Sequence, residues 1–175
     1  MSTSFDAGAN RLGALALRIT DRLHAAVRQA GDRSVSSATA LSAIDRFLDA
    51  RSIDELSRVL GLTSSATVRL VDGLVADGLA TRAPGPDARV SVVQLTDAGR
   101  RRAKRIVAAR AQVLVDTLSP LSADERATFQ ALADRILVGL VGVPSAQGWM
   151  CRLCDTETCG APRGEPCPIT RAALG

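Results

Sequence analysis

The sequence predicts a mainly α-helical fold with a small β-hairpin, and three observations lead to this prediction. Apolar residues recur at helical spacing over most of the chain, with Gly, Ser and Thr at the ends of each run. Hydrophobic residues make up 46% of the chain and aromatic residues only 2%, so the core must be aliphatic, which helix bundles allow. The stretch 52–99 is the third observation, because it reads as helix, tight turn, helix and hairpin in direct succession.

This stretch predicts a winged helix-turn-helix with a two-stranded wing. Its boundaries come from residues with known capping and turn preferences. They are the capping box Ser52 and Glu55, the helix end Gly61, the second cap Thr63, the second end Gly78, and the turn Pro84 to Asp87.

The second helix of this motif presents two different faces. Ala66, Leu70 and Leu74 share one face at 3.6 residues per turn, and we expect that face to be buried. The opposite arc carries small polar residues and an arginine, which can hydrogen-bond phosphates or base edges, and a valine that can pack on a thymine methyl group. The predicted DNA-contacting residues at or beside this arc are Ser64, Ser65, Thr67, Val68 and Arg69.

The segments LGLTSSATVRLVDGLVADGLA and DARVSVVQLTDAG resemble the MarR family of winged-helix transcription regulators. The wing motif is the specific part, with Asp87-x-Arg89 followed by Val93-x-Leu95-Thr96-x-x-Gly99. The resemblance covers roughly residues 10–141 and implies a DNA-binding regulator whose terminal helices form a dimer. Family members often carry Ser or Thr where Val68 stands and Arg where Gly73 stands, so the operator sequence of a relative does not carry over.

Positive charge concentrates around the predicted motif. Residues 51–110 hold 11 Lys or Arg against 6 Asp or Glu, whereas the remainder holds 11 against 12. On the wing, we expect Arg89 to enter the minor groove or touch phosphate, with Asp87 orienting its guanidinium. The basic run that follows the wing adds Arg100 and Arg101 as phosphate contacts, although a solvated helix end explains this run equally well.

Long helices are predicted on both sides of the motif, giving a fold with long N- and C-terminal dimerisation helices. The expected ranges are about 10–30, 37–50, 97–118 and, after the capping box of Ser122 and Glu125, 123–143. Apolar stripes that one domain cannot cover imply a homodimer with two-fold symmetry. Such a dimer would place two recognition helices about 34 Å apart, matching an approximately palindromic site in double-stranded DNA. We expect a repressor.

The chain divides into three parts by composition. Residues 1–9 are predicted to be disordered, residues 10–143 to form the DNA-binding and dimerisation domain, and residues 144–175 to form a linker and cysteine-rich tail. Apolar runs are too short for a signal peptide or a membrane span, so we expect a cytoplasmic protein without a membrane partner. The sequence leaves open whether a small-molecule effector binds, and its few aromatic residues offer little for stacking.

All four cysteines lie in the tail, at Cys151, Cys154, Cys159 and Cys167, with the spacing C-x2-C-x4-C-x7-C. Four thiolates bind zinc tetrahedrally, so a zinc site is the first interpretation. An iron–sulfur cluster also takes four thiolates, and Cys167-Pro168 resembles the last ligand of ferredoxin runs. A disulfide switch between Cys151 and Cys154, or incidental cysteines, are the remaining interpretations. No cysteine precedes this tail, which excludes a reactive cysteine in the first helix.

Two other classes of function compete with DNA binding. A thiol–disulfide oxidoreductase would use the pair Cys151 and Cys154, but no thioredoxin-like βαβ pattern surrounds it, so we expect no enzyme. A protein-interaction module could use the same winged-helix fold, but the basic charge around the motif favours a nucleic acid.

Overall fold

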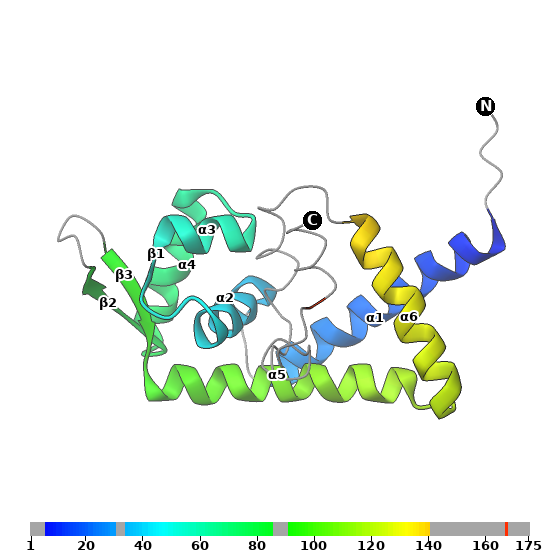
Figure 1. Cartoon of the computed structure of the whole chain (residues 1–175). Helices are drawn as coiled ribbons and strands as arrows, with labels where there is room; N and C mark the ends of the chain where they lie inside the picture. The colour runs from blue at the N-terminus through cyan, green and yellow to red at the C-terminus, as the bar shows by residue number, and fades with distance from the viewer. Residues whose placement is uncertain (1–5, 31–33, 86–90, 141–166, 168–175) are drawn as a thin grey trace.

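The protein has the predicted mainly α-helical fold. The computed structural model describes residues 6–30, 34–85, 91–140 and Cys167. Helix α5 runs beneath the molecule, with a small sheet at one of its ends and the helices α1 and α6 at the other (Figure 1). The elements are α1 (Ala7–Gln29), α2 (Val35–Arg46), β1 (Arg51–Ser52), α3 (Ile53–Leu60), α4 (Ser64–Ala76), β2 (Ala80–Pro84), β3 (Ser91–Leu95), α5 (Asp97–Leu118) and α6 (Ala123–Leu140).

Helices α3 and α4 form the predicted helix-turn-helix. They meet at an angle of 106° across a three-residue turn, within the range typical of this motif. Gly61 ends α3 with a φ of 64°, the left-handed conformation that glycine adopts without strain. The Thr63 hydroxyl accepts the Ala66 N–H at 3.2 Å and so caps α4, as predicted.

The capping box at the start of α3 is also present. The Ser52 hydroxyl accepts the Glu55 N–H at 3.2 Å, and the Glu55 carboxylate accepts the Ser52 N–H at 3.0 Å. The Ser52 hydroxyl also donates to this carboxylate at 3.0 Å. The hydrogen bond from the Ser52 backbone first, then the one from its hydroxyl, lower the pKa of Glu55, and the Arg51 guanidinium at 3.5 Å acts in the same direction. The carboxylate therefore stabilises the helix in its charged form.

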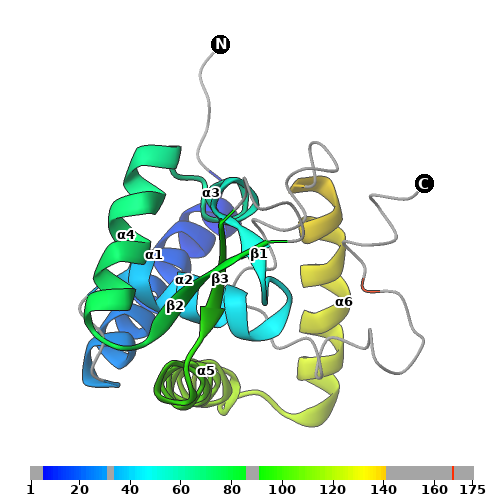
Figure 2. The same cartoon turned by 90° about the vertical axis from the view of Figure 1, so that its left-hand side faces the viewer.

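The sheet has three antiparallel strands in the order β1-β3-β2. The hairpin β2–β3 is the predicted wing, with Ala80 opposite Leu95 and Pro84 opposite Ser91. The sequence did not reveal β1, because two residues are too short to show the alternation of a strand. In Figure 2 the strands lie beside α4 and in front of α2, with α5 end-on below.

Two helix boundaries differ from the prediction. Helix α1 begins at Ala7, inside the range 1–9 that was predicted to be disordered, because the Asp6 carboxylate caps it by accepting the Gly8 N–H at 3.1 Å. Helix α2 spans Val35–Arg46 instead of 37–50. It ends early because Ala50 adopts a φ of 57° and donates its N–H to the Val93 carbonyl, which turns the chain into β1.

The core is aliphatic, as the composition predicted, and it lies where α2, α3, α4, β3 and the first half of α5 meet. Its largest fully buried apolar residues are Leu41, Ile44, Leu56, Val71, Val93 and Ile106. The junction of β3 and α5 is especially tight. Thr96 donates its hydroxyl to the Gly78 carbonyl at 2.7 Å, and a Cβ on Gly99 would lie 2.0 Å from the Leu79 carbonyl oxygen. Only glycine fits this contact between the wing and α5.

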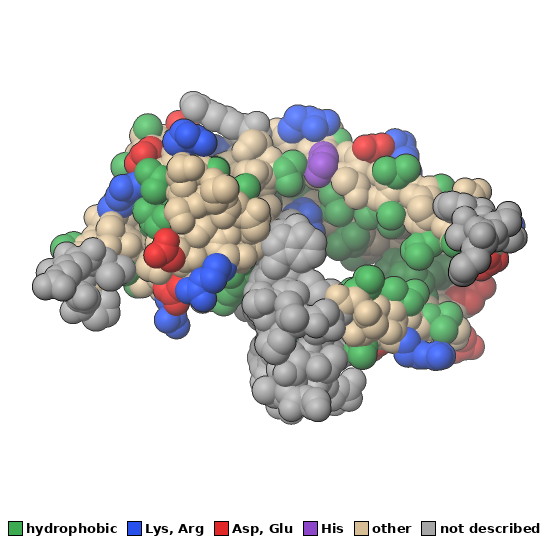
Figure 3. All heavy atoms as spheres, turned by 90° about the horizontal axis from the view of Figure 1, so that it is seen from above, with side chains coloured by type: hydrophobic (Ala, Val, Ile, Leu, Met, Phe, Trp, Pro, Cys, Tyr) green, Lys and Arg blue, Asp and Glu red, His purple; other side chains and the backbone are tan. Residues whose placement is uncertain are grey.

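Helix α6 and the adjoining ends of α1 and α5 pack differently, and we call these three segments the arms. No residue of α6 is buried. Figure 3 shows hydrophobic side chains gathered on the facing sides of the arms, at the end of the molecule away from the wing. The large exposed apolar residues of the arms are Leu12, Leu15, Leu17, Leu114, Val115, Phe129, Leu132, Ile136, Val138 and Leu140.

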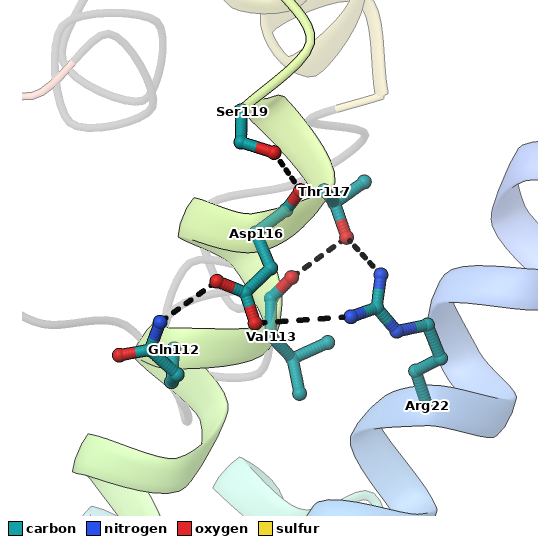
Figure 4. Close-up of polar contacts among 6 residues, drawn as sticks. All are labelled: Arg22, Gln112, Val113, Asp116, Thr117 and Ser119. Atoms are coloured by element: carbon teal, nitrogen blue, oxygen red, sulfur yellow. Dashed lines mark hydrogen bonds and ion pairs between the residues drawn. The ribbon is translucent and has the colours of Figure 1, made fainter.

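A polar network links α1 to the end of α5 (Figure 4). Arg22 donates to the Thr117 hydroxyl at 3.2 Å, and its guanidinium lies 3.9 Å from the Asp116 carboxylate. Gln112 donates to the other oxygen of Asp116 at 2.7 Å, and Thr117 donates to the Val113 carbonyl. The network fixes α1 across α5, and so it sets the direction in which the arm of α1 leaves the core.

Candidate nucleic-acid interface

The exposed face of α4 carries polar side chains at the helix start. Ser64 and Ser65 are exposed in the first turn, and the Ser65 hydroxyl lies 3.3 Å from that of Thr63. The first turn of a helix has free N–H groups and the positive end of the helix dipole, both of which favour a phosphate. These two serines are therefore placed where the sequence predicted them.

Thr67 is not part of this surface, and its prediction as a DNA-contacting residue was wrong. Its side chain is completely buried, on the same face as Val71 and Leu74. The hydroxyl is satisfied inside the protein, because it donates to the Thr63 carbonyl at 3.0 Å. A threonine that bonds back to its own helix can occupy the core, and that bond is invisible in a hydropathy pattern.

The buried face of α4 is accordingly rotated from the predicted one. Val71 and Leu74 are buried, whereas Ala66 and Leu70 are only partly covered. Val68, predicted to contact a thymine methyl group, is half-buried at the edge of the exposed face. It remains accessible there.

Arg69 is exposed one turn after Ser65, on the same side of α4. A hollow of about 170 Å³ lies beside it, between α4 and the start of α2. Its polar lining comes from Ser34, Ser37, Arg69 and Asp77. Arg69 and the serine hydroxyls suit a phosphate oxygen, whereas the Asp77 carboxylate on the same hollow disfavours an anion inside it.

The wing contributes an arginine that the sequence did not single out. Arg82 of β2 donates from Nη2 to Asp72 Oδ1 of α4 at 2.7 Å. The pair could not be found from sequence spacing, because it joins a helix to a strand across a turn. The predicted wing residues Asp87 and Arg89 lie outside the described residues, so their placement stays a prediction.

The two predicted phosphate contacts on α5 have different surroundings. Arg100 is half-buried, and its Nη2 lies 3.3 Å from the carboxylate of Asp49, in the loop after α2. Arg101 is exposed. The charge of Arg100 is therefore partly compensated within the protein, whereas Arg101 faces solvent.

Of the four cysteines, only Cys167 lies among the described residues, where it is buried. Cys151, Cys154 and Cys159 lie outside them. Within the described ranges, no three His, Cys, Asp or Glu side chains come together as a metal site would require. The four-cysteine site therefore stays a prediction from the spacing.

No single helix in the described part of the chain is long and apolar enough to cross a membrane. One bent pair, α3 with α4, reaches the required length and composition when the two helices are taken together.

Comparison with known proteins finds one matching family model and a set of solved structures with a similar fold. Residues 32–89, which contain the helix-turn-helix and the first part of the wing, match the sequence model of the MarR family. No curated protein sequence matches the chain.

Solved structures match over most of the chain. MarR from E. coli in its apo form is 26% identical, with a TM-score of 0.59 over 72% of this chain and 96% of that one. The PcaV transcriptional regulator from Streptomyces coelicolor is also 26% identical, with a TM-score of 0.57 over 75% and 98%. MepR from Staphylococcus aureus, a transcription regulator of the multidrug efflux pump MepA, is 16% identical, with a TM-score of 0.65 over 80% and 99%. These matches extend the likeness from the helix-turn-helix to the arms.

Proposed function

We propose that the chain is a transcription regulator of the MarR family, whose sequence model matches residues 32–89, and that it is a homodimer that binds an approximately palindromic site in double-stranded DNA. The observation that carries the proposal is the exposed face of α4. It presents Ser64, Ser65 and Arg69, and Asp72 of the same helix contacts Arg82 of the wing, so that a helix and a hairpin can engage neighbouring grooves of one duplex.

The arms support the homodimer. Phe129, Leu132 and Ile136 lie three and four residues apart along α6, and each is about half exposed in the single chain. Apolar stripes of this size on two adjoining helices are uncommon on the surface of a monomer. A second copy related by two-fold symmetry would cover them and would bring two copies of α4 to the same side of the dimer.

Repression is the proposed mode of regulation. A dimer that occupies about two turns of DNA over a promoter excludes RNA polymerase from it without further contacts. Transcription in vitro from a promoter that contains the selected site would measure this directly, and a rise in transcript on adding the protein would indicate an activator.

We further propose that the four cysteines of the tail hold zinc, with an iron–sulfur cluster as the alternative ligand. The support is the number of thiols, their clustering within 17 residues, and the C-x2-C pair at Cys151 and Cys154. Zinc would supply most of the folding free energy of a segment with so few apolar residues.

DNA binding is tested by selection. The purified protein would be mixed with a library of random duplexes, and bound DNA would be amplified and sequenced over several rounds. We expect an inverted repeat whose half-sites lie about one helical turn apart. Failure to enrich any sequence would contradict the proposal.

The role of α4 is tested with Arg69→Ala on the selected site. We expect about a tenfold loss of affinity and a salt dependence reduced by about one counterion. Arg135→Ala is the matched control, because it removes the same charge from an exposed position on α6, at the far end of the molecule from the wing. Equal losses from both variants would assign the effect to net charge alone.

The tail is tested on protein purified without oxygen. Colourless protein with about one zinc per chain is expected for a four-thiolate site. Brown protein containing iron and sulfide would identify a cluster instead. Metal-free protein whose free-thiol count falls after peroxide would overturn both ligands in favour of a disulfide switch.

A further inference from the structure

Asp72 stands out on the proposed DNA-binding face. It lies seven residues, about two helical turns, beyond Ser65 and three residues beyond Arg69, so all three share one side of α4. Its side chain is 60% exposed. An unpaired carboxylate in this position would face the phosphate backbone and repel it, and it would weaken binding to every DNA sequence.

Arg82 compensates this charge. Its guanidinium lies 2.7 Å from the Asp72 carboxylate, the length of a charge-assisted hydrogen bond. Exposed ion pairs of this kind add at most about 1 kcal/mol to folding stability, so the core does not depend on this one. Its position between the recognition helix and the wing indicates another role.

The pair also closes a mechanical link. Helix α4 and strand β2 are joined covalently through a tight turn, in which Gly78 has a φ of 68° and the Leu79 N–H donates to the Leu74 carbonyl at 2.8 Å. The bond between Asp72 and Arg82 joins the same two elements a second time, about one helical turn before the end of α4. Together with the pairing of β3 to β1, this second attachment restrains the angle between the hairpin and α4.

We propose that Arg82 is a positioning residue for DNA recognition. By binding Asp72 it holds β2 at a fixed angle to α4, and it cancels the carboxylate charge on the face that meets DNA. The helix and the wing then reach their grooves in one fixed geometry. This inference rests on the proposed DNA-binding function and adds to it the device that aligns the two reading elements.

The test is a double-mutant cycle with Asp72→Asn, Arg82→Gln and the double variant. Affinity would be measured for the selected site and for a random duplex, at several salt concentrations. The pair is neutral in the wild type and in the double variant, positive by one charge in Asp72→Asn, and negative by one in Arg82→Gln. For random DNA we therefore expect Asp72→Asn to bind most tightly, Arg82→Gln least tightly, and the double variant like the wild type.

The specificity ratio, the affinity for the selected site divided by that for random DNA, reports positioning. We expect it to fall by up to about fivefold in all three variants, because each one removes the charge-assisted hydrogen bond and leaves at most a neutral one between the wing and α4. Arg82→Lys keeps the charge but not the planar fork, so random-DNA affinity should stay near the wild-type value while the ratio falls in part. Thermal unfolding followed by circular dichroism checks that every variant is folded.

Two results would overturn the inference. A ratio that stays at the wild-type value in all variants would leave the pair without a role in recognition. A ratio that falls with Arg82→Gln but not with Asp72→Asn would make Arg82 a direct DNA contact. The wild type is measured first, and if it shows no preference for any selected site, the proposed function itself fails, which is distinct from both results.

Discussion

The winged-helix region buries its apolar side chains within the single chain, whereas the arms leave theirs exposed. Between α2 and the first half of α5 the chain covers its own core, and Val71 and Ile106 have no exposed surface. In the arms, Leu17 is 72% exposed and Leu140 is 65% exposed. Both regions consist largely of amphipathic helices, so the difference lies in what packs against them.

This difference separates two kinds of stability in one chain. The winged-helix region packs its helices and small sheet around one aliphatic core and can close within a single copy. In the proposed homodimer a second copy covers the stripes of the arms, so the order of the arms would depend on protein concentration. The effects of substitutions in the two regions should therefore be measured by different methods.

The largest effect is expected from Leu132→Asp combined with Ile136→Asp on α6. Burying two carboxylates in an apolar interface costs several kcal/mol, so the dimer should dissociate at micromolar concentration. Sedimentation or light scattering would measure the mass. Gln130→Asp on the opposite side of the same helix is the matched control and should remain dimeric. A double variant that stays dimeric would contradict the role assigned to the arms.

Next in size is Gly99→Ala in the winged-helix region. The added Cβ would overlap the Leu79 carbonyl and crowd Leu95, so the unfolding free energy should fall by about 3 kcal/mol, the upper end of overpacking costs. Urea unfolding measures the loss. Gly73→Ala is the control, because no described atom lies within 4 Å of its Cβ position and alanine favours the helix. Equal losses of unfolding free energy from the two variants would contradict the tight contact assigned to Gly99.

A smaller effect, and a contrast between the regions, is expected from the two capping-box carboxylates, Glu55 and Glu125. Hydrogen bonds from Ser52 and Ser122, respectively, lower the pKa of each below its ordinary value of 4.5. A lowered pKa means that the stabilisation is present above 4.5 and is lost as pH falls through the pKa of the folded state. In Glu55→Gln the unfolding free energy should therefore fall less as the pH is lowered than it does in the wild type. The difference should be less than about 1 kcal/mol, because the group is partly solvated.

Glu125→Gln is the counterpart on α6. Its carboxylate is fully exposed, and α6 has no buried residue, so acid unfolding of the winged-helix region should not respond to it. Urea unfolding at pH 3 to 7 would compare the two variants with the wild type. A response of equal size from both would show that the arm and the winged-helix region unfold as one unit.

The smallest effect concerns two buried hydroxyls in the same core. Ser42 Oγ has no hydrogen-bond partner among the described residues, whereas Thr67 Oγ1 donates to Thr63. Ser42→Ala should be neutral or stabilising by up to about 1 kcal/mol, and Thr67→Val should cost about 1 kcal/mol. Urea unfolding resolves the opposite signs. A clear loss of unfolding free energy in Ser42→Ala would indicate that the Ser42 hydroxyl forms a hydrogen bond in solution.

Local signals in the sequence determined the helix-turn-helix. Ser52, Glu55, Gly61 and Thr63 were assigned as caps or helix ends from their spacing alone, and all have these roles. A cap depends on contacts between residues no more than four positions apart, so the information lies within a short segment of chain. The exposed apolar stripes of the arms were predicted on the same basis, because helical periodicity is also local.

Only the tertiary structure decided the features that join distant segments. Thr67 is buried because α4 is rotated by its packing, β1 exists because β3 offers it an open edge, and Asp72 meets Arg82 because a turn folds the wing beside α4. Such contacts depend on the angle between elements, which is set by the packing of the whole core and leaves no periodic trace in the sequence. The sequence by itself determined the helices and the hairpin; the structure decided β1, the ends of α1 and α2, and which side chains remain exposed on the face proposed to bind DNA.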